Sequence, residues 1–405
     1  MSRCSAFAAS LHAVMTPQDP LIHEARRAKE VVDAALVELR KNGRLSDVSG
    51  LLGLPIAAMS SPDQARLHNI LTHYYFHAGN YVRALSHARE WGLVCPHGPS
   101  PLSSELFCLM RLRRWDELVL ASEKAVQRFP ADSSFYSCLS RSLFEKGRLC
   151  EARQAGTKCL ELKARSATGQ PANLNHPIPL EFNGSERLRN VISYSLYGDS
   201  QRYLEGALRN VVDASLLYPS WTCRFYVDES VPAGVVDDLS ALGADVRFVE
   251  GLPRGRFGLF WRFLVCEDSS IDRYLVRDCD SPLTIRERLA VDAWVSSAKH
   301  FHVMRDWITH TELILAGMWG GVGGSLVGME QRFRRYVGER FWSRTIDQQF
   351  LRECIWPTVR QSVLVHDSQF DFRPCSPFPP LSQLPAGHVG MGFKKMTGRY
   401  RYTSC

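Results

Sequence analysis

Apolar and small residues recur at a fixed interval in the N-terminal part of the chain. Three sets of positions keep an interval of 34 residues: Gly79, Arg113 and Gly147; Tyr81, Trp115 and Leu149; and Ala84, Leu118 and Ala152. A tight turn near a Gly between two amphipathic stretches predicts a helix, a turn and a second helix, with Pro96 and Pro130 at the exits. The middle unit departs from the pattern at Arg113 and Leu118.

This arrangement resembles the tetratricopeptide repeat. Tyr136, Leu139 and Ser140 stand where that repeat places the packing residues of its first helix. About three units are expected over residues 20–165, with the helical stretch at 20–60 as a cap and residues 1–19 weakly ordered. The resemblance implies a groove that binds a protein partner. A spacer or an element for self-association fits the same pattern equally well.

The periodicity changes after residue 165. Two stretches that contain Pro predict a linker over 166–186. Strands and helices then alternate, with strands expected at Arg189–Tyr197, Thr222–Asp228 and Asp245–Val249 and helices expected at Gly206–Leu217 and Val235–Leu242. The alternation predicts an α/β domain over residues 187–405, built on a mostly parallel sheet with helices on both faces. Ligands of such sheets bind beyond the carboxyl ends of the strands.

Composition narrows the class of protein only a little. The 405 residues are 45% hydrophobic and 22% charged, with a net charge of +7. No long basic block suggests nucleic-acid binding. The 12 Cys are scattered without a Cys-x-x-Cys pair, which disfavours a zinc module or a disulfide scaffold. The start of the chain is a poor signal peptide and no apolar run is long enough to cross a bilayer, so we expect a cytoplasmic protein without a transmembrane segment.

Candidate chemistry is concentrated at Asp278-Cys279-Asp280. The run Arg273–Arg277 predicts a short buried strand, and Pro282 ends the segment. Side chains at i and i+2 of an extended segment point to the same side. The two carboxylates therefore predict a site for Mg²⁺ or Mn²⁺, and such cations often bridge a protein carboxylate to a substrate phosphate. By itself the pair is also compatible with a solvated turn.

The region from about Arg189 onward resembles the metal-dependent GT-A glycosyltransferases, in particular bacterial enzymes that join a repeat domain to such a transferase. That family places Asp-x-Asp after the strand that closes its nucleotide-binding half. The resemblance implies a Rossmann-like domain that binds a nucleotide-diphosphate sugar with Mn²⁺ or Mg²⁺. Asp278 and Asp280 would hold the metal, and Asp280 is the more direct ligand of the two.

Further residues take their roles from the resemblance. Arg262, on the segment before the acidic strand, would contact the donor phosphates. Arg305 and Asp306 would contact the donor sugar or the acceptor, although a buried Arg-Asp pair that braces the loop is nearly as plausible. Asp347 of the Asp347-Gln348 pair would face the sugar, whereas an Asp at a helix start is also a common cap.

The remaining assignments complete the donor site and the metal site. His366, at the end of the expected strand Ser362–Ser368, is the predicted third metal ligand, and His388 is the alternative. The donor-binding group also includes residues at the end of the first strand, beside the acidic pair, in the Gly-rich loop and near the C-terminus: Ser195, Tyr197, Asp199, Arg277, Gly317 and Lys394.

The order of these features favours a hexosyltransferase that moves a sugar from a nucleotide-diphosphate donor to a glycan, lipid-linked or protein acceptor. The Asp-Gln pair inclines the prediction towards retention of configuration. A metal-dependent nucleotidyl or phosphoryl transferase uses the same acidic pair and diphosphate. The other alternative is a non-catalytic scaffold, in which the repeats bind a partner and the second domain is a degenerate transferase.

Overall fold

The computed structural model describes residues 20–42, 49–56, 59–174, 177–178, 182–250, 257–338, 345–372, 374–381, 388–396 and 399–402. The chain divides into two compact units, Met1–Arg148 and Leu149–Cys405, and each is described by itself. The predicted weak order of residues 1–19 lies outside the described residues. In the part of the chain that the structure describes, no helix has the length and apolar character needed to cross a membrane.

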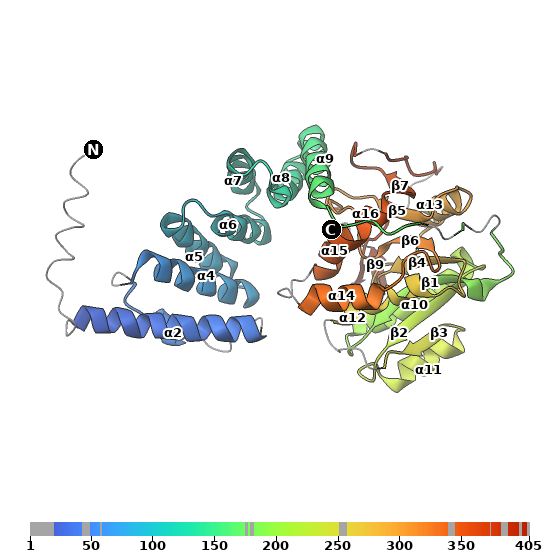
Figure 1. Ribbon diagram of the computed structural model, residues 1–405, viewed down its shortest axis with the longest axis horizontal. Helices are drawn as coiled ribbons and strands as arrows, with labels where there is room; N and C mark the ends of the chain where they lie inside the picture. The colour runs from blue at the N-terminus through green and yellow to red at the C-terminus, as the bar shows by residue number, and fades with distance from the viewer. Residues whose placement is uncertain are drawn as a thin grey trace. The chain divides into compact units, whose positions relative to one another are not determined.

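The first unit is a stack of helices (Figure 1). Its helices are α2 (Pro20–Asn42), α3 (Ser49–Leu52), α4 (Ser61–His77), α5 (Tyr81–Val94), α6 (Pro99–Arg111), α7 (Trp115–Arg128) and α8 (Ser133–Glu145). The helices α5, α7 and α9 (Leu149–Ser166) begin at the three positions that the 34-residue interval predicts. Ala28 and Val32 of α2 join the core cluster of this unit, as expected of a cap. The helices of this unit therefore repeat at the interval that the sequence predicts.

The three predicted turns share one backbone conformation. Gly79, Arg113 and Gly147 have φ angles of 77°, 55° and 75°, which lie in the left-handed region. In each turn the following residue donates a backbone hydrogen bond to a carbonyl five residues earlier, as from Arg114 to Leu109 at 3.0 Å. This is the bond of a Schellman closure, which favours Gly at the left-handed position. Arg113 is thus the one non-Gly residue with positive φ among the described residues.

We predict that Arg113→Gly stabilises the first unit. A non-Gly residue in the left-handed region costs about 1–2 kcal/mol, whereas Gly loses about 0.5–1 kcal/mol more conformational freedom on folding. The exposed side chain of Arg113 contributes little to offset that cost. The free energy of unfolding should therefore rise by up to about 1 kcal/mol, measured by chemical denaturation. Gly79→Arg should lower it, and equal effects of the two changes would contradict the explanation.

The helix α9 belongs to the second unit, so the division falls before the predicted linker at 166–186. Gly156 of α9 leaves no room for a Cβ because the ring of Phe370 lies directly against it. The Nζ of Lys163 donates to the carbonyl of Thr311 at 2.7 Å and to Glu312 at 2.6 Å. Because Lys163 is buried, this helix is fixed to the α/β unit by a desolvated ion pair.

The second unit contains a mixed sheet of seven strands in the order β3-β2-β1-β4-β6-β5-β7. The strands are β1 (Asn190–Leu196), β2 (Thr222–Val227), β3 (Asp245–Phe248), β4 (Arg273–Arg277), β5 (Phe301–Arg305), β6 (Met318–Val322) and β7 (Val363–Asp367). The described chain adds the hairpin of β8 (Phe393–Met396) and β9 (Arg399–Tyr402). The sequence predicts β1 to β4 and β7 closely, but it does not predict the hairpin.

Helices cover both faces of the sheet, as predicted. The helical segments are η2 (Arg187–Arg189), α10 (Gln201–Leu217), α11 (Ala233–Ala241), α12 (Gly258–Trp261), η4 (Leu264–Glu267), α13 (Ile285–Val295), α14 (Met329–Gly338), α15 (Ile346–Phe350), the π-helical η5 (Leu351–Ile355) and α16 (Trp356–Val359). Ile192, Tyr194 and Leu196 of β1 pack in one core with α10, α11 and α13. On the opposite face Ser193 and Ser195 contact the backbone of Arg262, directly after α12.

The Gly-rich stretch after Ala316 is a strand, although the sequence suggests that it is a loop lining a sugar pocket. It forms β6, which runs antiparallel between β4 and β5. A Cβ on Gly320 would lie 2.5 Å from the carbonyl oxygen of Tyr274, and one on Gly321 would collide with the Tyr274 hydroxyl. These two glycines therefore allow close strand packing and do not line a ligand pocket.

The strand order fixes where a ligand can bind. From β1 the chain proceeds to β2 and β3 on one side, and it then returns to place β4 on the other side of β1. Both β2 and β4 pair with β1 in parallel, so the carboxyl ends of β1 and β4 meet at the point where the strand order reverses. Such a reversal opens a crevice for ligands in α/β sheets. Asp278 follows β4 directly at this point.

Candidate functional site

The turn that carries the acidic pair is clamped onto α10. Gly206 lies so close to the carbonyl oxygen of Cys279 that a Cβ would collide with it. The side chain of Asn210 donates to the carbonyl oxygens of Cys279 and Ser281, each at 3.0 Å, and its own oxygen accepts from the backbone of Leu283. The carboxylates of Asp278 and Asp280 thus project from a backbone that a neighbouring helix holds rigidly.

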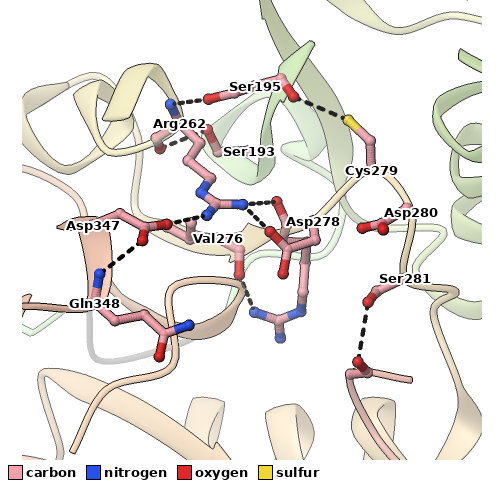
Figure 2. Close-up of polar contacts among 12 residues, drawn as sticks. Ser193, Ser195, Arg262, Val276, Asp278, Cys279, Asp280, Ser281, Asp347 and Gln348 are labelled. Atoms are coloured by element: carbon pink, nitrogen blue, oxygen red, sulfur yellow. Dashed lines mark hydrogen bonds and ion pairs between the residues drawn. The ribbon is translucent and has the colours of Figure 1, made fainter. Parts of the chain in front are cut away.

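Arg262 joins two carboxylates that come from distant parts of the sequence (Figure 2). Its Nη1 donates to Oδ1 of Asp278, and its Nη2 donates to Oδ2 of Asp347 at 3.1 Å. Ser195 accepts a hydrogen bond from the backbone N–H of Arg262, and Ser193 donates one to its carbonyl, each at 2.8 Å. The structure thus brings together the predicted phosphate-binding Arg, one predicted metal ligand and the predicted sugar-facing Asp.

Burial and ion pairing act in opposite directions on the charges of Arg262 and Asp347. Burial opposes the charge of Arg262, but the carboxylates of Asp278 and Asp347 outweigh it and raise the pKa of the guanidinium. Burial raises the pKa of Asp347 against the opposing effect of Arg262. Figure 2 shows the guanidinium between the two carboxylates, with Gln348 beside Asp347 donating its backbone N–H at 2.9 Å. The arrangement is an ion-paired carboxylate dyad beside the end of β4.

Asp280 has a separate partner. Its Oδ2 lies 2.6 Å from Nη2 of Arg202, which is half exposed on α10. Burial raises the pKa of Asp280, and the neighbouring charge of Asp278 adds to this rise. A bound cation would stabilise the ionised form of Asp280 at this strand end, because it would offset the charge of Asp278. The two Asp residues therefore fit a divalent cation in their chemistry.

The segment 388–393 lies against the acidic turn. The backbone N–H of Phe393 donates to the carbonyl of Asp280 at 2.7 Å, and Ser281 donates to the carbonyl of Gly390 at 3.2 Å. The φ of Gly390 is +81°, and a Cβ there would collide with Met318. The sequence gives this segment a lesser role than the structure does, because only the folded chain shows that it covers Asp280.

Asp306 anchors the other end of this segment. Its carboxylate accepts from the backbone of Val389 at 3.0 Å, from Ser368 at 2.6 Å and twice from Arg286 at 2.9 Å. Arg286 and Ser368 also line a cavity of about 450 Å³ in the second unit. Asp306 therefore connects the segment over Asp280 to a hollow that is large enough for a small ligand.

The structure does not bring the three predicted metal ligands together. Among the described residues no three His, Cys, Asp or Glu side chains form a group that could hold a metal ion. His366 lies on β7, at the far edge of the sheet, where its Nδ1 is 2.8 Å from Nε2 of His302. Burial and the charge of Arg286 lower the pKa of His366 to about 4. The structure therefore pairs His366 with His302 on neighbouring strands, and its role as a metal ligand stays a prediction.

His388 is in a different position. It belongs to the segment that contacts Asp280 and Ser281, and its ring stacks on Trp307 with centroids 4.8 Å apart. The Nδ1 atom pairs with the carbonyl of Val389, but the buried Nε2 has no hydrogen-bond partner in the structure. Burial lowers the pKa of His388, so the ring is neutral and keeps a lone pair for a ligand.

Arg305 and Arg277 are both buried in ion pairs within the protein. Arg305 is 0% exposed and donates from Nε to Asp367 at 2.7 Å, so the bracing pair is realised with Asp367 in place of Asp306. Arg277 is also buried and donates to Glu287 at 2.6 Å. The sequence cannot distinguish such pairs from ligand contacts, because the partner of each Arg is set by the tertiary fold.

The remaining predicted donor residues vary in their surroundings. Ser195 and Tyr197 are half-buried at the end of β1, and Asp199 is exposed beyond them. Gly317 lies against the Asp278 carboxylate, where a Cβ would collide with Oδ2. The side chain of Lys394 lies outside the described part of the chain, so its assignment stays a prediction.

Several residues of the site are absent from the sequence prediction. These are Arg202, Gly206, Asn210 and Ser368. The helix that holds the first three follows β1, which is where the first crossover helix of an α/β domain is expected. The small and polar residues of this helix are therefore the signal from which the sequence could have identified these positions.

Comparisons with known proteins add little to this geometry. No family model matches the chain, and no curated protein matches it. A mutant O-GlcNAc transferase of Thermobaculum terrenum is 17% identical, covers 59% of this chain and 43% of its own, and gives a TM-score of 0.38. The TPR2B domain of yeast Sti1, solved in a complex with an Hsp70 peptide, is 16% identical, covers 25% of this chain and 82% of its own, and gives a TM-score of 0.25. At these scores the likenesses carry no assignment.

We predict that Arg277→Met lowers the free energy of unfolding of the second unit by about 3–5 kcal/mol, because it leaves the buried Glu287 without its counter-charge. The double variant with Glu287→Leu should recover most of the loss. Chemical denaturation measures both. Arg209→Met, which breaks the pair of an exposed Arg with Asp213, should cost at most about 1 kcal/mol. A loss for Arg277→Met no larger than that of this control would show that the pair is not structural.

Proposed function

We propose that the second unit transfers a sugar from a nucleoside diphosphate donor to an acceptor, as a metal-dependent glycosyltransferase of the GT-A type. The observation that carries the proposal is the position of Asp278 and Asp280. They follow β4 where the carboxyl ends of β1 and β4 meet, and Arg262 ties Asp278 to Asp347. The strand order reverses at this point, which suits a bound ligand. The paired carboxylates suit a divalent metal ion that is bound together with a diphosphate.

The donor would lie along the ends of β1 and β4. Ser195 and Tyr197 are half-buried there, and the exposed Asp199 follows, so they are suited to the ribose and the base. Arg202 is half exposed beside Asp280 and offers a guanidinium to a phosphate oxygen. Arg262 is buried and already pairs with two carboxylates. We therefore assign Arg262 to holding Asp278 and Asp347 in position, and Arg202 to the phosphate contact.

A divalent cation, Mn²⁺ or Mg²⁺, fits the acidic pair. Asp278 and Asp280 would hold it with the donor phosphates, and it would supply positive charge that stabilises the leaving diphosphate. For the third protein ligand we propose His388 in place of His366. The segment of His388 contacts Asp280 and Ser281, and the Nε2 atom of His388 has no hydrogen-bond partner among the described residues. In contrast, His366 of β7 is paired with His302 of β5.

The carboxylates favour retention of configuration over inversion. An inverting enzyme needs a free carboxylate that accepts the acceptor's proton. Asp306 already accepts four hydrogen bonds, which fill the sites that a carboxylate offers. Asp347 is bonded to Arg262 and Gln348. We therefore propose that the leaving phosphate takes that proton, while Asp347 stabilises positive charge on the sugar.

One observation favours the alternative of a non-catalytic scaffold. The described residues contain no ready group of three metal-ligating side chains. In that case the helical repeats would bind a protein partner and the second unit would bind no donor. Product analysis distinguishes the remaining alternatives, because sugar transfer releases a nucleoside diphosphate whereas nucleotidyl transfer releases pyrophosphate.

We predict that Asp280→Asn abolishes the binding of nucleotide sugars in the presence of Mn²⁺. The full wild-type chain is screened against such donors. A donor that binds should raise the free energy of unfolding by about 2.7 kcal/mol at a ligand concentration of 100 Kd. Thermal shift measures this, and Asp280→Asn should show no shift. Asp238→Asn, an exposed change of the same type on α11, is the control. An undiminished Mn²⁺-dependent shift in Asp280→Asn would refute the metal site.

We also predict that Asp280→Asn without ligands is more stable than the wild type at neutral pH. The pKa of Asp280 is raised in the fold, so ionisation there costs stability as pH rises through that pKa. The gain should disappear as pH falls toward the ordinary pKa of Asp, because the wild-type carboxyl then takes up a proton. Thermal unfolding as a function of pH measures the difference. A gain that is independent of pH would point to another cause.

The two histidines make distinct predictions. His388→Ala should raise the Mn²⁺ concentration needed for half-maximal donor binding by about tenfold or more. His366→Ala should leave that concentration unchanged and lower stability instead, because it leaves a cavity beside His302. Metal titrations followed by donor binding measure both variants. The opposite pattern would restore His366 as the ligand.

A further inference from the structure

A second cavity lies in the α/β unit, away from the acidic pair. It has a volume of about 490 Å³, and its wall is formed by α14, η5 and the residues that follow α9. Small-molecule sites typically enclose about 300–1,000 Å³. The cavity is therefore of the right size for a metabolite, and no part of the proposed sugar transfer uses it.

The wall of this cavity carries an excess of positive charge. It includes Arg332, Arg335 and Arg352 but only one carboxylate, that of Glu353. Arg352 is neutralised, because it pairs with Glu312 at 3.3 Å and with Glu353 at 3.2 Å. Arg332 and Arg335 form no ion pair within the described part of the chain. The net charge that faces the cavity is thus contributed by α14.

Arg332 and Arg335 are spaced so that both side chains line the same cavity. Residues three apart on a helix lie on the same face. Arg334, between them in sequence, does not line the cavity and pairs with Glu330 at 2.7 Å. Two guanidinium groups thus converge on the cavity, whereas the third cation of this helix is engaged elsewhere.

The opposite wall is tightly built. Residues Leu351–Ile355 form a π-helical turn, a local irregularity that often occurs at functional sites. A Cβ on Gly169 would lie 2.6 Å from the carbonyl oxygen of Glu353, so the chain after α9 runs directly on this turn. The hydroxyl of Thr168 lines the cavity beside it. The site thus offers two guanidinium groups that have no ion pair among the described residues, and a neutral donor, on a fixed wall.

We propose that this cavity binds the phosphate group of a small organic phosphate through Arg332 and Arg335. A phosphate dianion accepts charge-assisted hydrogen bonds from two planar guanidinium groups at once, whereas a neutral sugar carries no charge to pair with them. The remaining volume accommodates a group of about the size of one sugar ring. The site is separate from the donor crevice and does not depend on the proposed sugar transfer.

The test is a calorimetric titration of the full chain with glucose 1-phosphate and with inorganic phosphate, with glucose as the uncharged control at constant ionic strength. The double variant Arg332→Gln/Arg335→Gln should weaken phosphate binding by roughly ten- to a hundredfold, because it removes two charged hydrogen-bond donors. Arg334→Gln removes the same charge from the same helix outside the cavity. That control should bind within about twofold of the wild type, as expected for an exposed pair.

A second control distinguishes this cavity from the acidic pair, because Arg202 and Arg262 also place positive charge there. Arg202→Gln should leave the binding of glucose 1-phosphate unchanged, and the double variant should keep the Mn²⁺-dependent binding of a nucleotide sugar. Failure of the proposed sugar transfer would leave the phosphate titration untouched. Wild-type binding by the double variant, loss of binding in Arg202→Gln, or no phosphate binding by the wild type would each overturn the proposal.

Discussion

The ion pairs of Arg262 hold the candidate site together. The backbone of this residue is bound to two Ser side chains of β1, and its guanidinium joins Asp278 after β4 to Asp347 at the start of α15. Three segments that are far apart in sequence are thereby fixed around one buried cation. Removing that cation would leave the buried carboxylate of Asp347 without a counter-charge, which is among the most costly changes a protein interior can undergo. The site geometry and the stability of this part of the fold therefore depend on the same contacts.

Much of the fold could be predicted because its signals are local. The interval of 34 residues predicts the first residue of three helices, and β4 spans Arg273–Arg277 as the pattern predicts. The partners of buried charges could not be predicted in this way. Arg305 is of a residue type that often binds ligands, yet it pairs with Asp367, which lies 62 residues later in the sequence. A buried Arg looks the same in sequence whether its partner is a ligand or a neighbouring strand, and only the strand order decides between them.

The C-terminal segment shows a second limit of local patterns. His366 ends a well-predicted strand, but the order of the sheet places that strand at the edge, two strands beyond β6. His388 belongs to a segment of irregular structure whose position is set by single hydrogen bonds to Asp280, Ser281 and Asp306. The choice between the two histidines therefore depends on topology, to which the spacing of residues along the chain is insensitive. The same segment is hydrogen-bonded to both Asp306 and Asp280.

The positive φ of Arg113 has a consequence for the motions of the helical unit. Its turn stores conformational free energy that the corresponding turns at Gly79 and Gly147 do not store. In a linear array each element is held only by its neighbours, so opening begins where the local free energy is least favourable. The loop between α6 and α7 is thus the natural place for sub-global unfolding, and its amides would exchange with solvent before those of the two flanking turns. Arg113, at a position that favours Gly, would therefore make the middle of the array the first part to open.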